Sequence, residues 1–165
     1  MFVLGIDPGL STTGYGVIDS SGKRPVAVTA GVIRTDPASP LGHRLVELHT
    51  DLSSVIAEYQ PAEAAVEQVF VNRNLQTATS VGRASGVILL TLAQAGLPTE
   101  EYTPSAVKMA LCGYGNAPKE QVMRVVSMRL ALPAAPKPAD ASDALAIALC
   151  HLQSSSLARA IGGRR

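Results

Sequence analysis

Cysteine is scarce in this 165-residue sequence, which has only two. Cys112 and Cys150 lie far apart and belong to no Cys-x-x-Cys or Cys/His pattern of the kind that binds zinc. This arrangement favours free thiols in a reducing compartment, and the simplest role for both residues is that of small buried apolar side chains.

The sequence also lacks a long apolar run. Met1 to Ile6 is apolar, but it stops at Asp7 and has no basic lead, so a secretory signal is not expected. Val87 to Ala93 is interrupted by Thr91 and is far shorter than the ~20 residues that span a membrane. We therefore expect a cytoplasmic protein without membrane contact.

A strong net charge is missing as well, since the formal charge is only +1. Taken alone, this value gives little indication of a nucleic-acid partner. If several carboxylates were bound to metal ions, the rest of the surface would carry an excess of basic groups that could approach phosphates. Length and apolar content fit one globular domain, which we place at residues 1–157, followed by a flexible basic tail at 158–165.

Short apolar strands open the chain and a periodic helix follows. Phe2 to Ile6 is predicted as a buried strand that stops at Asp7-Pro8-Gly9, because proline fixes φ and glycine permits the turn. Thr13 to Asp19 and Val26 to Ile33 are predicted as further strands of an antiparallel meander. From Leu41 to Tyr59 apolar residues recur at spacings of three and four, which indicates an amphipathic helix.

Helices and strands alternate in the remainder of the sequence. The predicted elements are strands at 64–69 and 100–103 and helices at 74–96, 104–111, 118–130 and 140–154. Three strands followed by this alternation predict an α/β protein with a mixed sheet and helices on both faces.

Two acidic residues accompany predicted strands. Asp7 closes the first strand, where an aspartate before Pro-Gly is also a common turn former, and the local sequence leaves both interpretations open. Glu67 lies inside the apolar segment from Ala64 to Phe70, where an unpaired carboxylate would be costly. A partner or a metal ion is therefore expected at Glu67.

Asp140 and Asp143 stand at positions i and i+3 of the last predicted helix, so both project from one face. Asp-x-x-Asp ahead of Ala144 to Ile147 is also typical of a capped helix start, and the local sequence favours that simpler role. The two roles are compatible, because a helix N-terminus keeps carboxylates ionised, as a hard cation requires.

Three segments together resemble the RuvC family of Holliday junction resolvases. They are Gly5-Ile6-Asp7-Pro8-Gly9, Val66-Glu67-Gln68-Val69-Phe70 and the stretch from Ala139 to Ala148. Each segment alone is only moderately specific, whereas all three in this order and in a chain of this length are a strong signal. The resemblance covers nearly the whole chain.

This resemblance implies a ribonuclease H-like fold, with a five-stranded mixed sheet in the order 3-2-1-4-5 and helices on both faces. The first and fourth strands are neighbours in that fold, so Asp7 and Glu67 would meet, with Asp140 and Asp143 reaching in from the last helix. The resemblance assigns these four residues as catalytic residues and metal ligands of an endonuclease for four-way (Holliday) DNA junctions. Some family members carry histidine at the position of Asp143.

A ligand set made only of carboxylates suits Mg²⁺, with Mn²⁺ as the alternative, rather than zinc. We hypothesise two ions per active site, ~4 Å apart and bridged by Asp7, of which one activates water and the other stabilises the leaving 3′ oxygen. The products would carry a 5′ phosphate.

The resemblance also implies DNA contacts. Lys108, and Lys119 beside the loop Gly113-Tyr114-Gly115, match family lysines that approach the scissile strand, although a lone surface lysine is usually only solvated. Phe70 matches a family aromatic residue that stacks on an unpaired base, with core packing as the competing interpretation. Weaker DNA-contact candidates are Arg73, Arg83 and Tyr114.

Symmetric paired nicks require two sites, which predicts a homodimer with both sites on one DNA-binding face. The small residues Ala78, Gly82, Ala84 and Gly86 make one helix the interface candidate, and packing on the sheet explains them equally well. RuvA and RuvB as branch-migration partners, and a role in recombination and DNA repair, follow from the resemblance alone.

Two other functional classes are compatible with parts of this sequence. Gly5 to Gly14 also resembles the first phosphate loop of actin-like ATPases and sugar kinases, but those enzymes need a second domain for which this chain is too short. A DNA-binding module without catalytic activity is the other class, and the complete acidic set argues against it.

Overall fold

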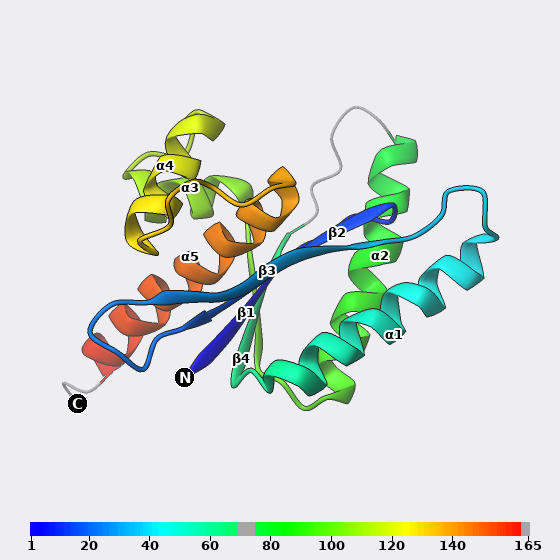
Figure 1. Ribbon diagram of the computed structural model, residues 1–165, viewed down its shortest axis with the longest axis horizontal. Coiled ribbons are helices and arrows are strands. Elements are labelled where there is room, and N and C mark those ends of the chain that lie inside the picture. The colour runs from blue at the N-terminus through cyan, green and yellow to red at the C-terminus, as the bar shows by residue number, and fades with distance from the viewer. Residues whose placement is uncertain (69–74, 163–165) are drawn as a thin grey trace.

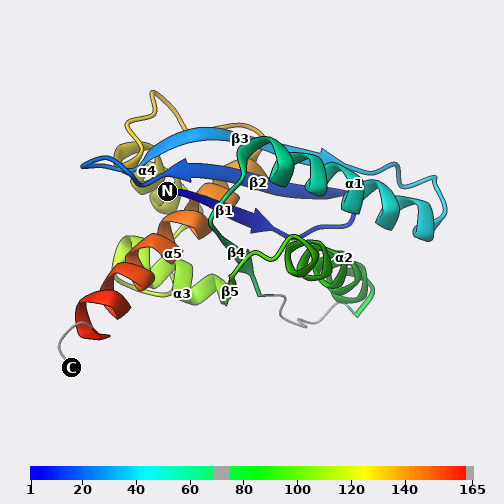
Figure 2. The same ribbon diagram turned by 90° about the horizontal axis from the view of Figure 1, so that it is seen from below.

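The computed structural model describes residues 1–68 and 75–162, and the side chains of these residues except 75–77 and 156–162. Five strands form one sheet with helices on both faces (Figures 1 and 2). The strands are β1 (Phe2–Asp7), β2 (Thr12–Asp19), β3 (Val26–Arg34), β4 (Glu63–Glu67) and β5 (Thr99–Tyr102). Their order is β3-β2-β1-β4-β5, which confirms the predicted topology.

The sheet is mixed, as predicted. β1 pairs antiparallel with β2, and β2 with β3, whereas β1 pairs parallel with β4, and β4 with β5. The helices are α1 (Leu41–Tyr59), α2 (Leu75–Gln94), α3 (Pro104–Cys112), α4 (Lys119–Arg129) and α5 (Ala139–Gly162). Figures 1 and 2 show α1 and α2 together on one face of the sheet and α3, α4 and α5 on the other.

Each face of the sheet has its own hydrophobic core, because successive side chains of a strand point to opposite faces. In β1, Leu4 and Ile6 pack in the cluster beneath α1 and α2, whereas Val3 packs in the cluster beneath α5. In β2, Val17 belongs to the first of these clusters and Ile18 to the second. Asp7 of β1 and Glu67 of β4 lie on the face of the sheet that is turned toward α5.

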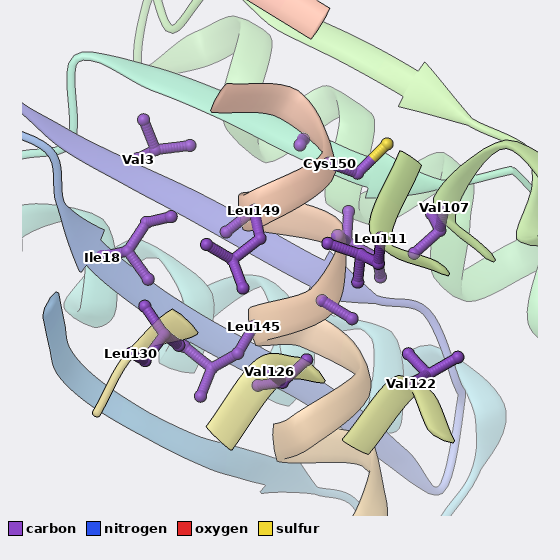
Figure 3. Packing of buried hydrophobic residues seen from close by; sticks show 14 of the residues in the cluster. Val3, Ile18, Val107, Leu111, Val122, Val126, Leu130, Leu145, Leu149 and Cys150 are labelled. Atoms are coloured by element: carbon purple, nitrogen blue, oxygen red, sulfur yellow. The ribbon is translucent and has the colours of Figure 1, made fainter. Parts of the chain in front are cut away.

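Helix α5 is buried on nearly all sides over its middle turns. Every residue from Ala144 to His151 is buried, which is expected of a helix enclosed between a sheet and other helices. Figure 3 shows Leu145 and Leu149 of this helix between Ile18 of the sheet and Val126 of α4. The apolar run that follows Asp143 is thus core, and it fixes the position of the helix that carries both aspartates.

Several element ends differ from the sequence prediction, and two of these differences bear on the site and on α5. Strand β4 ends at Glu67 instead of residue 69, so Glu67 lies at the end of the strand rather than inside it. Helix α5 continues to Gly162 instead of ending at 154.

Both cysteines are free thiols, which confirms the prediction. Cys150 is buried in the core beneath α5, and Cys112 is partly buried. Among residues 1–68 and 75–162, no helix combines the length and the apolar character that a bilayer crossing would need.

Candidate active site

Strand alternation turns two acidic side chains toward α5. Gly5 of β1 faces α5, since a Cβ built on it would lie 2.1 Å from the carbonyl oxygen of Ala144, and Asp7 is two residues further along the same strand. In β4, Ala65 packs beneath α5, so Glu67 shares its face. Asp7 and Glu67 therefore point to the same side of the sheet.

Strand register brings these two carboxyl groups together. β1 and β4 run parallel with Ile6 beside Val66, so Asp7 and Glu67 are the next residues at the carboxyl ends of neighbouring strands. Their side chains lie close enough to share a hydrogen bond when one of the two carboxyl groups is protonated. Residues far apart in the sequence thus meet at one sheet edge.

Glycines allow the start of α5 to approach this edge closely. Gly14 pairs with Asp7 across the β1–β2 ladder, and a Cβ built on Gly14 would lie 2.1 Å from the carbonyl oxygen of Asp140. This distance is too short for any real side chain, so only glycine fits there. The missing side chain lets the first turn of α5 pack against β2 directly beside Asp7.

Burial and negative neighbours raise the pKa of Asp7 to about 7. Removal from water is the largest cause, followed by the charges of Glu67, Asp143 and Asp140, while Lys119 acts in the opposite direction. The positive charge around Asp7 is therefore too small to offset the free-energy cost of ionising its carboxyl group.

Burial is also the main reason why the pKa of Glu67 is raised. The charge of Asp143 adds to this effect, whereas Lys119, Lys108 and the hydrogen bond from Asp7 lower the pKa. The charges of Asp143 and Lys119 thus act on both Asp7 and Glu67. A bound cation would favour the ionised form of both groups.

Asp143 has a cationic partner within the protein. Its Oδ2 atom lies 2.6 Å from Nζ of Lys119, the first residue of α4. This contact and the neighbouring carboxylates raise the pKa of Lys119. Within the described part of the chain, no three acidic, histidine or cysteine side chains stand close enough to enclose a metal ion as they are oriented here. The four predicted ligands thus share one electrostatic field, and only Asp7 and Glu67 are in direct contact.

Both predicted lysines lie beside these carboxylates. Lys108 of α3 and Lys119 line a cavity of about 230 Å³ together with Glu67 and Asp143. Apolar residues of α3, α4 and α5 complete its wall. The cavity therefore joins two acidic groups to two basic groups at the end of β4.

The other predicted DNA contacts are placed only in part. Tyr114 is exposed in the segment between α3 and α4, and its hydroxyl donates a hydrogen bond to Oε1 of Gln121. Arg83 is exposed on α2. Phe70 and Arg73 lie outside the described residues.

One polar network on the same face was missed in the sequence. Glu63, at the other end of β4, lies 2.8 Å from Nε2 of His151, and Nδ1 of that histidine lies 3.0 Å from the hydroxyl of Tyr102. Glu63 and Glu67 stand four residues apart on one strand, and that even spacing could have indicated that both face α5. No local pattern pointed to the histidine, which comes from α5.

Comparison with known proteins places the chain among junction nucleases. The family described as "Crossover junction endodeoxyribonuclease RuvC" matches residues 3–151. Curated relatives of that name include those of Desulfitobacterium hafniense (strain DSM 10664 / DCB-2), 48% identical with 99% of each chain covered, and Heliobacterium modesticaldum, 50% identical with 91% of this chain and 93% of the relative covered.

Solved structures agree with this result. The structure described as "T. thermophilus RuvC in complex with Holliday junction substrate" is 37% identical, covers 96% of each chain and has a TM-score of 0.90. The yeast mitochondrial Holliday junction resolvase Ydc2, at 13% identity, covers 93% of this chain and 80% of its own, with a TM-score of 0.63, and supports the fold alone. The predicted ribonuclease H-like fold is confirmed.

Proposed function

The chain belongs to the RuvC family of crossover junction endodeoxyribonucleases, and we propose that it resolves four-way DNA junctions by paired, symmetric, metal-dependent nicks. The observation that carries this proposal is the contact of Asp7 with Glu67 in the field of Asp140 and Asp143. A relative 37% identical over nearly the whole chain is described in complex with a Holliday junction substrate. Homologous recombination and DNA repair are the processes that such an activity would serve.

Membership of this nuclease family implies dependence on a divalent metal. The residues present fit such an ion, because two partly buried carboxyl groups with raised pKa values would gain from a cation. Asp7, Glu67, Asp140 and Asp143 would hold it. Oxygen ligands suit Mg²⁺, with Mn²⁺ as the alternative, and we propose two ions in each site. When bound, they would supply Lewis-acid stabilisation and an activated water.

The lysines of the cavity have a separate role in this proposal. Lys108 and Lys119 would position the scissile phosphate, because each can place an ammonium group beside the carboxylates. Phe70, Arg73 and Tyr114 are proposed as further DNA contacts, with Phe70 stacking on an unpaired base. All of these residues fall within the proposed nuclease domain, residues 1–157.

A homodimer would supply the second active site. The small residues of α2 divide into two groups: Ala84 is buried in the core beneath α1 and α2, whereas a Cβ on Gly82 or Gly86 would meet no atom within 4 Å. Leu90, one turn after Gly86, has 54% of its surface exposed. This exposed side of α2 supports the dimer proposal, which light scattering of the protein with junction DNA tests directly. RuvA and RuvB are the proposed branch-migration partners.

Substitution of Asp7 by asparagine tests the proposed function. The variant Asp7→Asn keeps the shape of the side chain but removes a charge from the metal site, so we expect junction cleavage in Mg²⁺ to fall about 1000-fold or more. Circular dichroism and junction binding should be unchanged. Cleavage at the wild-type rate would exclude the proposed role of Asp7.

The same assay separates the competing classes. A DNA-binding module without catalytic activity would bind the junction and leave it uncut with or without Mg²⁺. A nucleotide hydrolase would release phosphate from ATP and leave the junction intact. Linear duplex DNA of the same sequence is the control substrate, and equal cutting of it would contradict selectivity for junctions.

A further inference from the structure

The contact between Lys119 and Asp143 joins a proposed DNA-binding group to a proposed metal ligand. The distance of 2.6 Å between Nζ and Oδ2 is that of a direct ion pair. Lys119 begins α4, and Asp143 lies in the first turns of α5, so two separate helices meet at this pair. The ammonium group of Lys119 can therefore bind either the carboxylate of Asp143 or a phosphate group of DNA.

We propose that Lys119 is an internal cation that competes with the divalent ion for Asp143, and that metal binding releases its ammonium group for the DNA backbone. This inference rests on the proposed function, because it requires Asp143 to be a metal ligand. It makes metal binding and phosphate binding depend on one another through a single side chain.

Charge and exposure both favour such an exchange. The positive charge of Lys119 acts on Asp7, Glu67, Asp140 and Asp143, so in the protein alone it compensates part of the negative field. A divalent ion would provide more positive charge in the same place and would repel the ammonium group. The Lys119 side chain is 56% exposed, so it can leave Asp143 without being buried elsewhere. An exposed ion pair is weak enough to be exchanged.

Lys108 provides a matched comparison within the same cavity. Both lysines line that cavity and both act electrostatically on Glu67. In the described part of the chain, Lys108 forms no ion pair with a carboxylate, whereas Lys119 does. Replacing either lysine by methionine removes one charge from the same region, but only the Lys119 change removes a direct contact with Asp143.

Calorimetric titration with Mn²⁺, without DNA, tests the competition. We expect Lys119→Met to bind Mn²⁺ about fivefold more tightly than wild type, because a competing cation has gone, and Lys108→Met to change the affinity by less than about twofold. In the Asp143→Asn background, the Lys119→Met substitution should increase the affinity for Mn²⁺ much less, because the carboxylate that the lysine competes for is gone. Circular dichroism checks folding, and Lys119→Gln replaces the methionine variant if that variant is unstable.

Nuclear magnetic resonance of ¹⁵N-labelled lysine side chains tests the release without any substitution. The hydrogen-bonded ammonium signal of Lys119 should be present in the metal-free protein and should lose its protection as Mg²⁺ is added. Equal effects of the two lysine substitutions, or an unchanged Lys119 signal at saturating Mg²⁺, would overturn the inference. Failure of the wild-type protein to bind any divalent ion would instead contradict the proposed metal site itself.

Discussion

The two glutamates of β4 face the same helix from the same strand, yet their surroundings are opposite. Glu63 lies against His151, whose other ring nitrogen is close to the hydroxyl of Tyr102. In a neutral imidazole, Nε2–H donates to the carboxylate and Nδ1 accepts from the tyrosine, so the chain of hydrogen bonds is complete. Glu67 instead lies against Asp7, a second carboxyl group, within a field of further negative charge.

This difference separates a structural carboxylate from a candidate ligand. A buried carboxylate with its own hydrogen-bond partners stabilises the packing of α5 on the sheet and needs nothing from outside. A buried carboxyl group with like-charged neighbours raises the energy of the folded protein until a cation or a proton compensates it. A partly buried acidic residue is thus found at both ends of β4, and the identity of its partner distinguishes the two ends.

The largest expected effect comes from making the same change at both ends. Glu67→Gln should lower junction cleavage about 100- to 1000-fold and leave stability unchanged or higher, because it removes a charge from an overly negative site. Glu63→Gln should leave cleavage within about threefold but lower the free energy of unfolding by about 1–2 kcal/mol, because it weakens the bond to buried His151. Single-turnover cleavage and urea denaturation of both variants measure these quantities.

The comparison between the two glutamates would fail if both variants behaved alike. A Glu63→Gln protein that is as stable as wild type but inactive would assign a catalytic role to the network of Glu63, His151 and Tyr102. A Glu67→Gln protein that is active but unstable would make Glu67 a packing residue.

The residue patterns predicted the mixed sheet, and the resemblance to the RuvC family predicted the strand order and the meeting of Asp7 with Glu67. Strand periodicity and the family-like segments around Asp7 and Glu67 can both be recognised in the sequence. The register of β1 with β4 then brings these two segments together. The resemblance predicted that the last helix reaches this site, but the role of Gly14 was not predicted, because it becomes visible only when Asp140 lies against it. The partner of Asp143 was not predicted either, since the resemblance assigns Lys119 to DNA alone and this lysine reaches the aspartate from a different helix.

The pH dependence of stability should show the second-largest effect. The pKa of Asp7 is about 7 in the folded protein and 3.8 in its ordinary state, so the folded protein holds a proton that the unfolded chain has lost between these values. The contribution of Asp7 to the free energy of unfolding is therefore fully present below about pH 4 and is lost as the pH rises through 7. Without metal, the wild-type protein should become less stable from pH 5 to pH 8.

Asp7→Asn cannot ionise at this position, so it isolates the effect. Relative to wild type, the variant should gain about 2 kcal/mol in the free energy of unfolding between pH 5 and pH 8, measured in a chelating buffer. Added Mg²⁺ should return stability to the wild-type protein at pH 8 and have little effect on the variant. Parallel pH profiles for the two proteins would mean that ionisation of Asp7 does not destabilise the folded protein, which would remove the contrast between the two ends of β4.

The smallest expected effect tests the hydroxyl group at the structural end. Tyr102→Phe removes the group that lies 3.0 Å from His151 Nδ1, and it should lower the free energy of unfolding by about 1 kcal/mol while junction cleavage stays at the wild-type rate. Tyr114→Phe is the matched control, because it deletes a hydroxyl on an exposed residue and should change stability by less than about 0.5 kcal/mol. Equal losses in urea denaturation would mean that Tyr102 contributes no more than a surface hydroxyl. A slower cleavage rate in Tyr102→Phe would instead mean that this end of α5 helps to hold Asp140 and Asp143 in place, since the one helix carries His151 and both aspartates.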